Sequence, residues 1–139
     1  MSEPNRQQQL RLDSTLASVD LAENAVSEAA RQLGFNDDQQ YELGMAVRES
    51  MVNAVIHGNK SDRGKHVVLT VHSENGALRV VVEDEGDGLV MSDVADPTAG
   101  DNLLRSSGRG LLIIKAYTDE FAVEPRQPRG TRVVMVKRR

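Results

Sequence analysis

The chain has 139 residues and a net charge of −4, and it is 39% hydrophobic, 27% charged and only 3% aromatic. This composition predicts one globular domain with one core, and it argues against a nucleic-acid binder because both positive charge and base-stacking aromatic side chains are scarce. Without cysteine, disulfides, thiolate metal ligands and cysteine nucleophiles are excluded, and without a long apolar run we expect a soluble, cytoplasmic protein that does not enter a membrane.

The N-terminal part of the chain predicts a strand followed by a helix. Residues 1–9 are polar and Gln-rich, and we expect them to be a flexible N-terminus. Apolar alternation over residues 10–16 predicts a short edge strand. The following residues repeat small apolar side chains at helical spacing, which predicts a helix that is capped by Ser18 or Asp20 and stopped by Gly34.

A second helix carries the first candidate for chemistry. It is expected to begin at the capping box Asn36 to Gln39 and to end at Gly58. Glu49 and Asn53 are one helical turn apart, so their side chains leave the same face at the border of the apolar stripe. An amide oxygen is a suitable ligand for Mg²⁺, and a carboxylate can deprotonate a nucleophile. An exposed Glu and a helix-end Asn without any functional role would give the same sequence pattern. His57 is interpreted as a helix-end residue.

A hairpin and a second candidate motif follow. Strands are expected over residues 66–73 and 77–83, joined by a two-residue Asn75-Gly76 turn. Asp84 comes directly after the second strand, where its carboxylate can accept hydrogen bonds from an exocyclic amine. Gly86 and Gly88 would let the backbone approach a ligand closely, although an acidic turn between elements is an equally good interpretation.

The C-terminal half begins with a long glycine-rich loop. Five of the eleven glycines lie between residues 86 and 110, and a loop of this length is usually functional or disordered. A helix is expected over residues 109–117, and two strands over residues 120–124 and 131–137. Helices that are segregated from hairpins predict an α+β fold, a two-layer sandwich of helices on one face of a mixed, mainly antiparallel sheet.

The third candidate motif lies where the loop enters that helix. Gly108 and Gly110 open an apolar helix, and free N–H groups at a helix N-terminus favour an anion. Ser107 and Arg109 are weaker candidates for the same contact. A flexible hinge before a helix would have the same composition. The sequence holds neither a P-loop motif nor a complete dinucleotide-binding motif.

The order of the three motifs is more specific than any one of them. Glu-xxx-Asn on a helix, Asp-x-Gly-x-Gly after a hairpin and Gly-x-Gly at a helix start resemble the Bergerat ATP-binding fold of gyrase-type ATPases, sensor histidine kinases and anti-sigma kinases. Among these, the chain is most similar to the small single-domain anti-sigma factor protein-serine kinases. The resemblance extends from about residue 10 to residue 136 and implies one ATP-binding kinase domain over residues 10–139, with an ATP lid over about 89–107.

The resemblance also implies roles for the motif residues. It makes Glu49 the general base and Asn53 the Mg²⁺ ligand, and it places the adenine amine on Asp84. The nucleotide would further contact Gly86, Gly88, Ser107, Gly108, Arg109 and Gly110. The cofactors would be ATP and Mg²⁺, an arrangement that suits phosphoryl transfer because this chemistry needs positioning and charge neutralisation.

The resemblance leads to one hypothesis and two alternatives. We expect an anti-sigma factor serine kinase that phosphorylates a Ser or Thr of a STAS-type antagonist and binds a sigma factor, forms a homodimer, and binds neither nucleic acid nor membrane. The first alternative is a nucleotide-binding regulatory module without catalysis. The second is a detached catalytic domain of a histidine kinase, for which the partner would need a phospho-accepting His.

Overall fold

The computed structural model describes residues 6–87 and 110–139. Within these two ranges, five strands form one sheet in the order β1-β2-β3-β5-β4. The strands are β1 (Arg6–Asp13), β2 (His66–Glu74), β3 (Ala77–Glu83), β4 (Glu120–Pro125) and β5 (Thr131–Arg138). The helical elements are α1 (Leu16–Leu33), α2 (Asp37–Val52), the π-helix η1 (Asn53–Gly58) and α5 (Gly110–Ala116).

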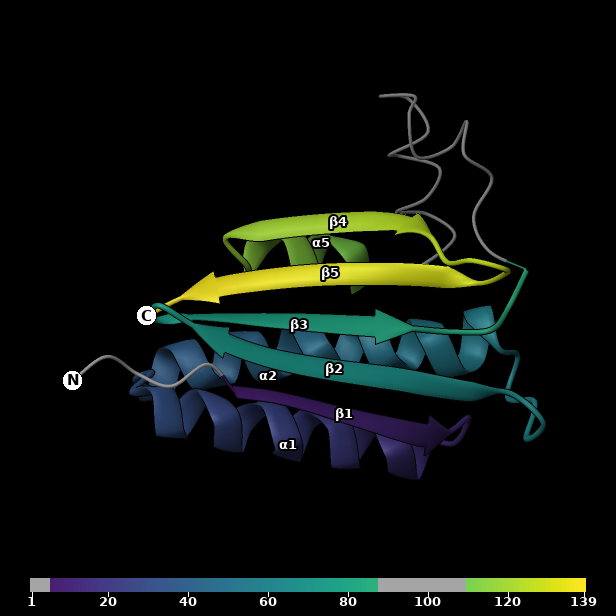
Figure 1. Cartoon of the computed structure of the whole chain (residues 1–139), viewed down its shortest axis with the longest axis horizontal. Coiled ribbons are helices and arrows are strands. Elements are labelled where there is room, and N and C mark those ends of the chain that lie inside the picture. The colour runs from purple at the N-terminus through teal and green to yellow at the C-terminus, as the bar shows by residue number, and fades with distance from the viewer. Residues whose placement is uncertain (1–5, 88–109) are drawn as a thin grey trace.

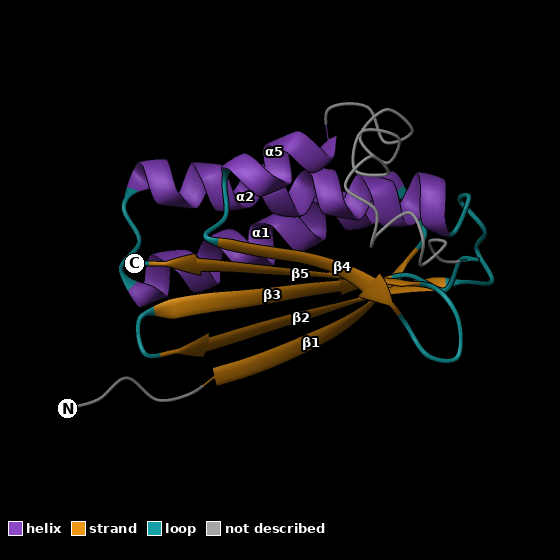
Figure 2. Cartoon of the chain, turned by 90° about the horizontal axis from the view of Figure 1, so that it is seen from above, coloured by secondary structure: helices purple, strands orange, loops and turns teal. Residues whose placement is uncertain are grey.

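The elements form two layers, as predicted. Figures 1 and 2 show α1, α2 and α5 together on one face of the sheet, and α2 packs against both other helices. This confirms the α+β sandwich with helices on one face. The expectation of a mixed sheet is wrong for the described strands, because every pair of neighbours in the sheet is antiparallel.

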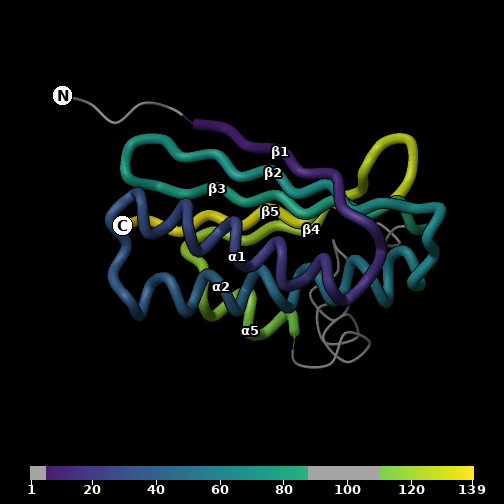
Figure 3. The backbone as a smooth tube through the Cα atoms, turned by 90° about the horizontal axis from the view of Figure 1, so that it is seen from below, coloured from purple at the N-terminus to yellow at the C-terminus, as the bar shows by residue number. Residues whose placement is uncertain are grey.

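The first strand begins earlier than predicted. β1 starts at Arg6, and residues 7–9 pair in register with β2, so residues 6–9 are not a flexible end. Polar side chains are tolerated here because β1 lies at the edge of the sheet, where its Gln side chains are exposed. Figure 3 shows β1 running along β2 before the chain turns into α1.

The first helix also begins earlier than predicted. Its N-cap is Thr15, which has an extended backbone, so neither Ser18 nor Asp20 caps the helix. Asp20 lies inside α1, where its carboxylate accepts a hydrogen bond of 2.9 Å from Arg48 of α2. The predicted stop at Gly34 is confirmed, because this residue is the C-cap.

Local sequence chemistry sets two other junctions as expected. The Asn36 side chain accepts from the backbone N–H of Gln39, and the Gln39 side chain accepts from the backbone N–H of Asn36, which is a complete capping box. In the β2–β3 hairpin, Asn75 and Gly76 have φ values of 52° and 77°, as a tight two-residue turn requires. Both predictions are confirmed.

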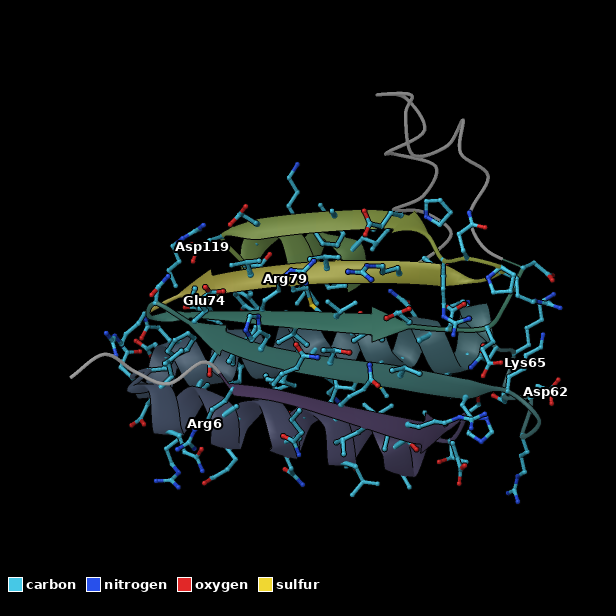
Figure 4. All side chains as sticks on the ribbon, in the orientation of Figure 1. Arg6, Asp62, Lys65, Glu74, Arg79 and Asp119 are labelled. Carbon is cyan, nitrogen blue, oxygen red and sulfur yellow. The ribbon has the colours of Figure 1, made fainter. Side chains whose placement is uncertain are left out.

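The core lies between the helices and the covered face of the sheet. The largest fully buried side chains come from every layer and are Leu43, Met51, Leu69, Leu78, Ile114 and Met135. The other face of the sheet is not covered by helices in the described part of the chain, and Arg79 projects from it (Figure 4). Across the described residues, we find no helix with the length and apolar character needed to cross a membrane.

Candidate functional site

A cavity of about 310 Å³ lies between the helical layer and one end of the sheet. Its walls come from α2 and η1 on one side and from β3, β5 and the segments around them on the other. The lining residues are Ser50, Asn53, Ala54, His57, Gly58, Lys60, Val82, Asp84, Asp87, Leu111, Val123, Thr131 and Val133. The cavity therefore combines valine and leucine walls with a few polar side chains, as small-molecule sites usually do.

Asp84 is the buried acid of this cavity. It follows β3 and is only 6% exposed. Its Oδ1 accepts hydrogen bonds from the backbone N–H groups of Gly86, at 2.9 Å, and Thr131, at 3.2 Å. Its Oδ2 faces Gly58 and has no hydrogen-bond donor among the described residues. The backbone thus fixes the carboxylate and leaves one oxygen for a donor in the cavity.

Burial changes the protonation of this acid. The pKa of Asp84 is raised above its ordinary value of 3.8, because removal from water disfavours the charged form. The two backbone hydrogen bonds oppose this rise, and the positive charges of Arg126 and Lys65 oppose it more weakly. A buried carboxylate that lacks a counter-ion in direct contact is suited to accept N–H donors from a ligand.

Three glycines let the backbone close around Asp84. A Cβ on Gly58 would lie 2.3 Å from Asp84 Oδ2, and a Cβ on Gly86 would lie 2.1 Å from the Gly58 carbonyl oxygen. Gly130 has a φ of +107°, and a Cβ there would lie 1.9 Å from the Asp84 carbonyl oxygen. Any side chain at these positions would displace backbone or the carboxylate itself. Gly86 was predicted to shape a site; Gly58 and Gly130 were not.

A buried amide anchors the segment that carries Asp84. Asn59, which is 0% exposed, donates from Nδ2 to Ser14 Oγ at 2.8 Å and to the His66 carbonyl at 3.0 Å. Its Oδ1 accepts from the backbone N–H of Glu85 at 2.7 Å. One side chain therefore joins the end of η1, the β1–α1 corner, the start of β2 and the residue next to Asp84.

Glu49 and Asn53 meet the start of α5 beside the cavity. They lie one turn apart at the α2–η1 junction, and both are half-buried. A Cβ on Gly110 would lie 3.0 Å from Glu49 Oε2 and 3.4 Å from Asn53 Nδ2, so a side chain at this position would crowd both groups. Neither side chain has a hydrogen-bond or ion-pair partner within residues 6–87 and 110–139. The structure thus brings together three of the predicted residues.

This group fits a Mg²⁺ ion that is shared with a nucleotide rather than a site made by protein alone. In the described part of the chain, no group of three or more His, Cys, Asp or Glu side chains could hold a metal. Mg²⁺ commonly uses one or two protein oxygens and takes its other ligands from phosphates and water. The Asn53 amide oxygen, which lines the cavity and has no other partner there, is compatible with that role.

Charged side chains form the rim of the cavity. Asp87 accepts a hydrogen bond of 2.9 Å from Arg129, and Lys60 Nζ lies 3.9 Å from the other Asp87 oxygen. Lys60 has a φ of 53°, an uncommon backbone conformation for a lysine, and it lines the cavity. Because both partners of the Lys60–Asp87 pair are highly exposed, the pair adds little stability.

The remaining predicted site residues cannot be placed. Gly88, Ser107, Gly108, Arg109 and the lid over 89–107 lie outside the described residues.

The sequence reasoning missed several residues of the cavity. His57 was interpreted as a helix end but lines the cavity, as do Ser50 and Thr131. The valines at 82, 123 and 133 also line it. The spacing of His57 and Ser50 from Asn53 on one helix face was a usable signal. No such signal existed for Thr131, because only the pairing of β3 with β5 brings this residue next to Asp84.

The contact between Gly86 and Gly58 leads to a testable prediction. Gly86→Ala is expected to lower the free energy of unfolding by about 1–3 kcal/mol and to weaken ligand binding at Asp84, because the added methyl group would overlap a backbone carbonyl. Chemical denaturation measures the stability effect. Gly64→Ala is the matched control, since a Cβ there would meet only the Asp62 side chain at 3.2 Å. Equal stability of the two variants would contradict the close approach.

Comparison with known proteins gives one family. The profile of the histidine kinase-like ATPase domain matches residues 12–137. The chain is 31% identical over 131 residues to the anti-sigma F factor of Geobacillus thermodenitrificans, covering 92% of this chain and 89% of the relative. It is 30% identical over 136 residues to that of Priestia megaterium, covering 94% and 91%, and 28% identical over 117 residues to that of Clostridium perfringens, covering 82% and 83%.

Solved structures show the same fold. The RsbU and RsbW domains of a Mycobacterium tuberculosis protein align with a TM-score of 0.69 at 20% identity, covering 97% of this chain and 33% of that one. A mycobacterial sensor histidine kinase, MprB, aligns with a TM-score of 0.61 at 20% identity, covering 94% of this chain and 97% of that one. At this identity the likeness concerns the fold alone, and it confirms the type of fold that the motif order predicted.

Proposed function

Because the chain belongs to the histidine kinase-like ATPase domain family, we propose that it is an ATP- and Mg²⁺-dependent protein-serine kinase. Its substrate would be a Ser or Thr of an anti-sigma factor antagonist, and it would also bind a sigma factor. The observation that carries this proposal is the meeting of the Glu49 carboxylate and the Asn53 amide at Gly110, beside the cavity that holds Asp84.

The nucleotide would lie in the cavity with its base at the sheet. The free Oδ2 of Asp84 would accept the adenine amine, and the valine and leucine walls would enclose the ring. Gly86 would let the backbone approach the base. The phosphates would extend toward Asn53 and Gly110, and the lid, with Gly88, Ser107, Gly108 and Arg109, would complete the contacts.

Transfer would proceed at the α2–α5 contact. Glu49 would accept the proton of the substrate hydroxyl. The hydroxyl oxygen would attack the γ-phosphorus, while the bond from phosphorus to the leaving ADP oxygen breaks. Asn53 would hold Mg²⁺, which neutralises charge on the phosphates when it is bound. Since Glu49 and Asn53 have no other partner in the described residues, both side chains are available for these roles.

The partners are proposed from the relatives. Several similar proteins are named anti-sigma F factors, and their alignments cover most of both chains. We therefore propose a STAS-type antagonist as the phosphate acceptor and a sigma factor as the second partner, both in the cytoplasm, with the kinase acting as a homodimer. No role for nucleic acid or membrane is proposed.

Two functions are alternatives to the proposed kinase activity. In a regulatory module without catalysis, nucleotide binding would control partner binding and Glu49 would only line the site. In a detached histidine-kinase catalytic domain, the acceptor would be a His of another protein. The free Glu49 beside Asn53 favours catalysis over the first, and the chemistry of the product separates the second.

Intact mass spectrometry tests the proposal directly. The chain is incubated with Mg-ATP and a STAS-type antagonist from the same organism, and we expect a mass increase of one phosphoryl group on the antagonist alone. The modification should survive acid, as phosphoserine and phosphothreonine do and phosphohistidine does not. ATP binding without transfer would support the regulatory module, and an acid-labile product would support the histidine-kinase alternative.

A further inference from the structure

One buried polar side chain that lines the cavity has no role in the proposed function. Ser50 is 1% exposed and is one of the residues that line the cavity. Its Oγ has no hydrogen-bond partner among the described residues. A serine within a helix can usually return its hydroxyl to the carbonyl four residues earlier, but this hydroxyl does not do so. It is therefore a buried donor and acceptor that no described residue satisfies.

The strand register places Ser50 relative to Asp84. Asp84 adjoins Thr131, with a backbone hydrogen bond of 2.9 Å between them, and Val82 pairs with Val133 one repeat further inward. That repeat is about 7 Å along the strands. On the helical side, Gly58 contacts Asp84 and Ser50 lies about two turns before it. Ser50, Val82 and Val133 all line the same cavity as Asp84.

An unpaired hydroxyl in this position has a cost. Leaving a buried donor or acceptor without a partner destabilises the folded protein, and an alanine, which has no hydroxyl, would avoid this cost. No described residue of the cavity lining forms a hydrogen bond with the Ser50 hydroxyl. A hydrogen bond with the occupant of the cavity would compensate for this cost.

We infer that the Ser50 hydroxyl is a second hydrogen-bonding group for the nucleobase, in addition to Asp84. The inference rests on the proposed function in taking ATP or ADP as the occupant. A 6-aminopurine has two amine hydrogens, of which Asp84 takes one. The second hydrogen and the adjacent ring nitrogen N7 are a donor and an acceptor side by side. A hydroxyl can serve either, directly or through one bridging water.

Calorimetric titration with ADP tests this role. Ser50→Ala is expected to weaken ADP binding by about 5-fold, the usual effect of one neutral hydrogen bond. The penalty should disappear with one of two analogues: 7-deaza-ADP, which lacks the N7 acceptor, or purine riboside diphosphate, which lacks the amine. Without nucleotide, Ser50→Ala should have a melting temperature about 3–6 °C above that of the wild type, because it no longer buries an unpaired hydroxyl.

A higher melting temperature together with a lower ADP affinity in Ser50→Ala would distinguish a ligand contact from a purely structural role. If Ser50 only supported the fold, Ser50→Ala would lower the melting temperature and leave ADP affinity unchanged, which would overturn the inference. Unchanged ADP affinity at any melting temperature, or a penalty that persists with both analogues, would also overturn it. Ser27→Ala, in α1 and outside the cavity, controls for the general effect of removing a helical hydroxyl.

A second variant protects the test from a folding defect. Ser50→Cys keeps the shape of the side chain but forms much weaker hydrogen bonds, so it should reproduce the loss of ADP affinity. Full ADP affinity in this variant would overturn the inference as well. If the wild-type protein did not bind ADP at all, the proposed function itself would fail. Normal wild-type binding with no effect at Ser50 would overturn only the inference.

Discussion

Asp84→Asn is expected to weaken ADP binding by about 100-fold, the effect of losing a hydrogen bond to a charged group and creating a mismatch. The two backbone N–H groups that now bind Oδ1 would hold the asparagine oxygen in the same place. Its NH₂ group would then occupy the position of Oδ2 and face the adenine amine, donor against donor. Isothermal titration calorimetry measures the change in Kd.

The same geometry predicts a change of base preference. In Asp84→Asn the NH₂ group can donate to the 6-oxo group of hypoxanthine, so the affinity for IDP relative to ADP should increase. Asp87→Asn is the matched control, because Asp87 also lines the cavity but is highly exposed; its effect on ADP binding should be small. Wild-type ADP affinity in Asp84→Asn would remove Asp84 from the base contact.

Although Asp84→Asn should weaken ADP binding, it should not destabilise the nucleotide-free protein. Below pH 3.8 the Asp84 carboxyl is protonated in both the folded and the unfolded chain. Between that value and the raised pKa of the folded state, the folded chain binds more protons, so stability falls as the pH rises through this window. Above the window the cost is constant. Asp84→Asn should therefore be at least as stable as the wild type at neutral pH in denaturation experiments.

Glu49→Gln is expected to lower the rate of phosphoryl transfer by about 10²–10⁴-fold, the usual contribution of a general base. The amide has the same shape as the carboxylate but cannot accept the hydroxyl proton. ADP affinity should stay close to that of the wild type, because Glu49 lies beside Gly110 and is not among the residues that line the cavity. Single-turnover transfer to the antagonist and a parallel ADP titration separate the two quantities.

A distant carboxylate provides the control for this variant. Glu28→Gln changes an exposed side chain of α1 that pairs with Arg31, and it should alter neither transfer nor binding. Equal transfer rates in wild type and Glu49→Gln would exclude Glu49 as the base. Loss of ADP affinity in Glu49→Gln would instead indicate that the carboxylate acts in nucleotide binding.

The parts of the fold that the sequence predicts well are those determined by local chemistry. The capping box at Asn36, the turn at Asn75 and Gly76, and the stop at Gly34 each depend on residues within a few positions of one another. The start of α1 was missed because Thr15 precedes the helix with an extended backbone and without a side-chain cap hydrogen bond. The polar start of β1 was missed because only its pairing with β2 makes it a strand.

The candidate site divides in the same way. Glu49, Asn53, Asp84 and Gly86 could be found because each lies in a short motif with a chemical rationale. Thr131 and Gly130 contact Asp84 only because β5 lies beside β3, and no spacing along the chain records that neighbourhood. The π-helix Asn53–Gly58 is a further example, because the sequence predicted one helix that continues to Gly58.

The buried amide of Asn59 has a consequence for motion. Its three hydrogen bonds join the β1–α1 corner, the start of β2 and the segment that carries Asp84. Opening any one of these segments would leave buried polar groups of the others without partners, so we expect the segments to open together in local unfolding. A nucleotide that holds Asp84 would therefore also slow the opening of the N-terminal strand, at the far edge of the sheet from β4. A ligand in the cavity would thus change the opening rate of β1, a strand that the ligand does not contact.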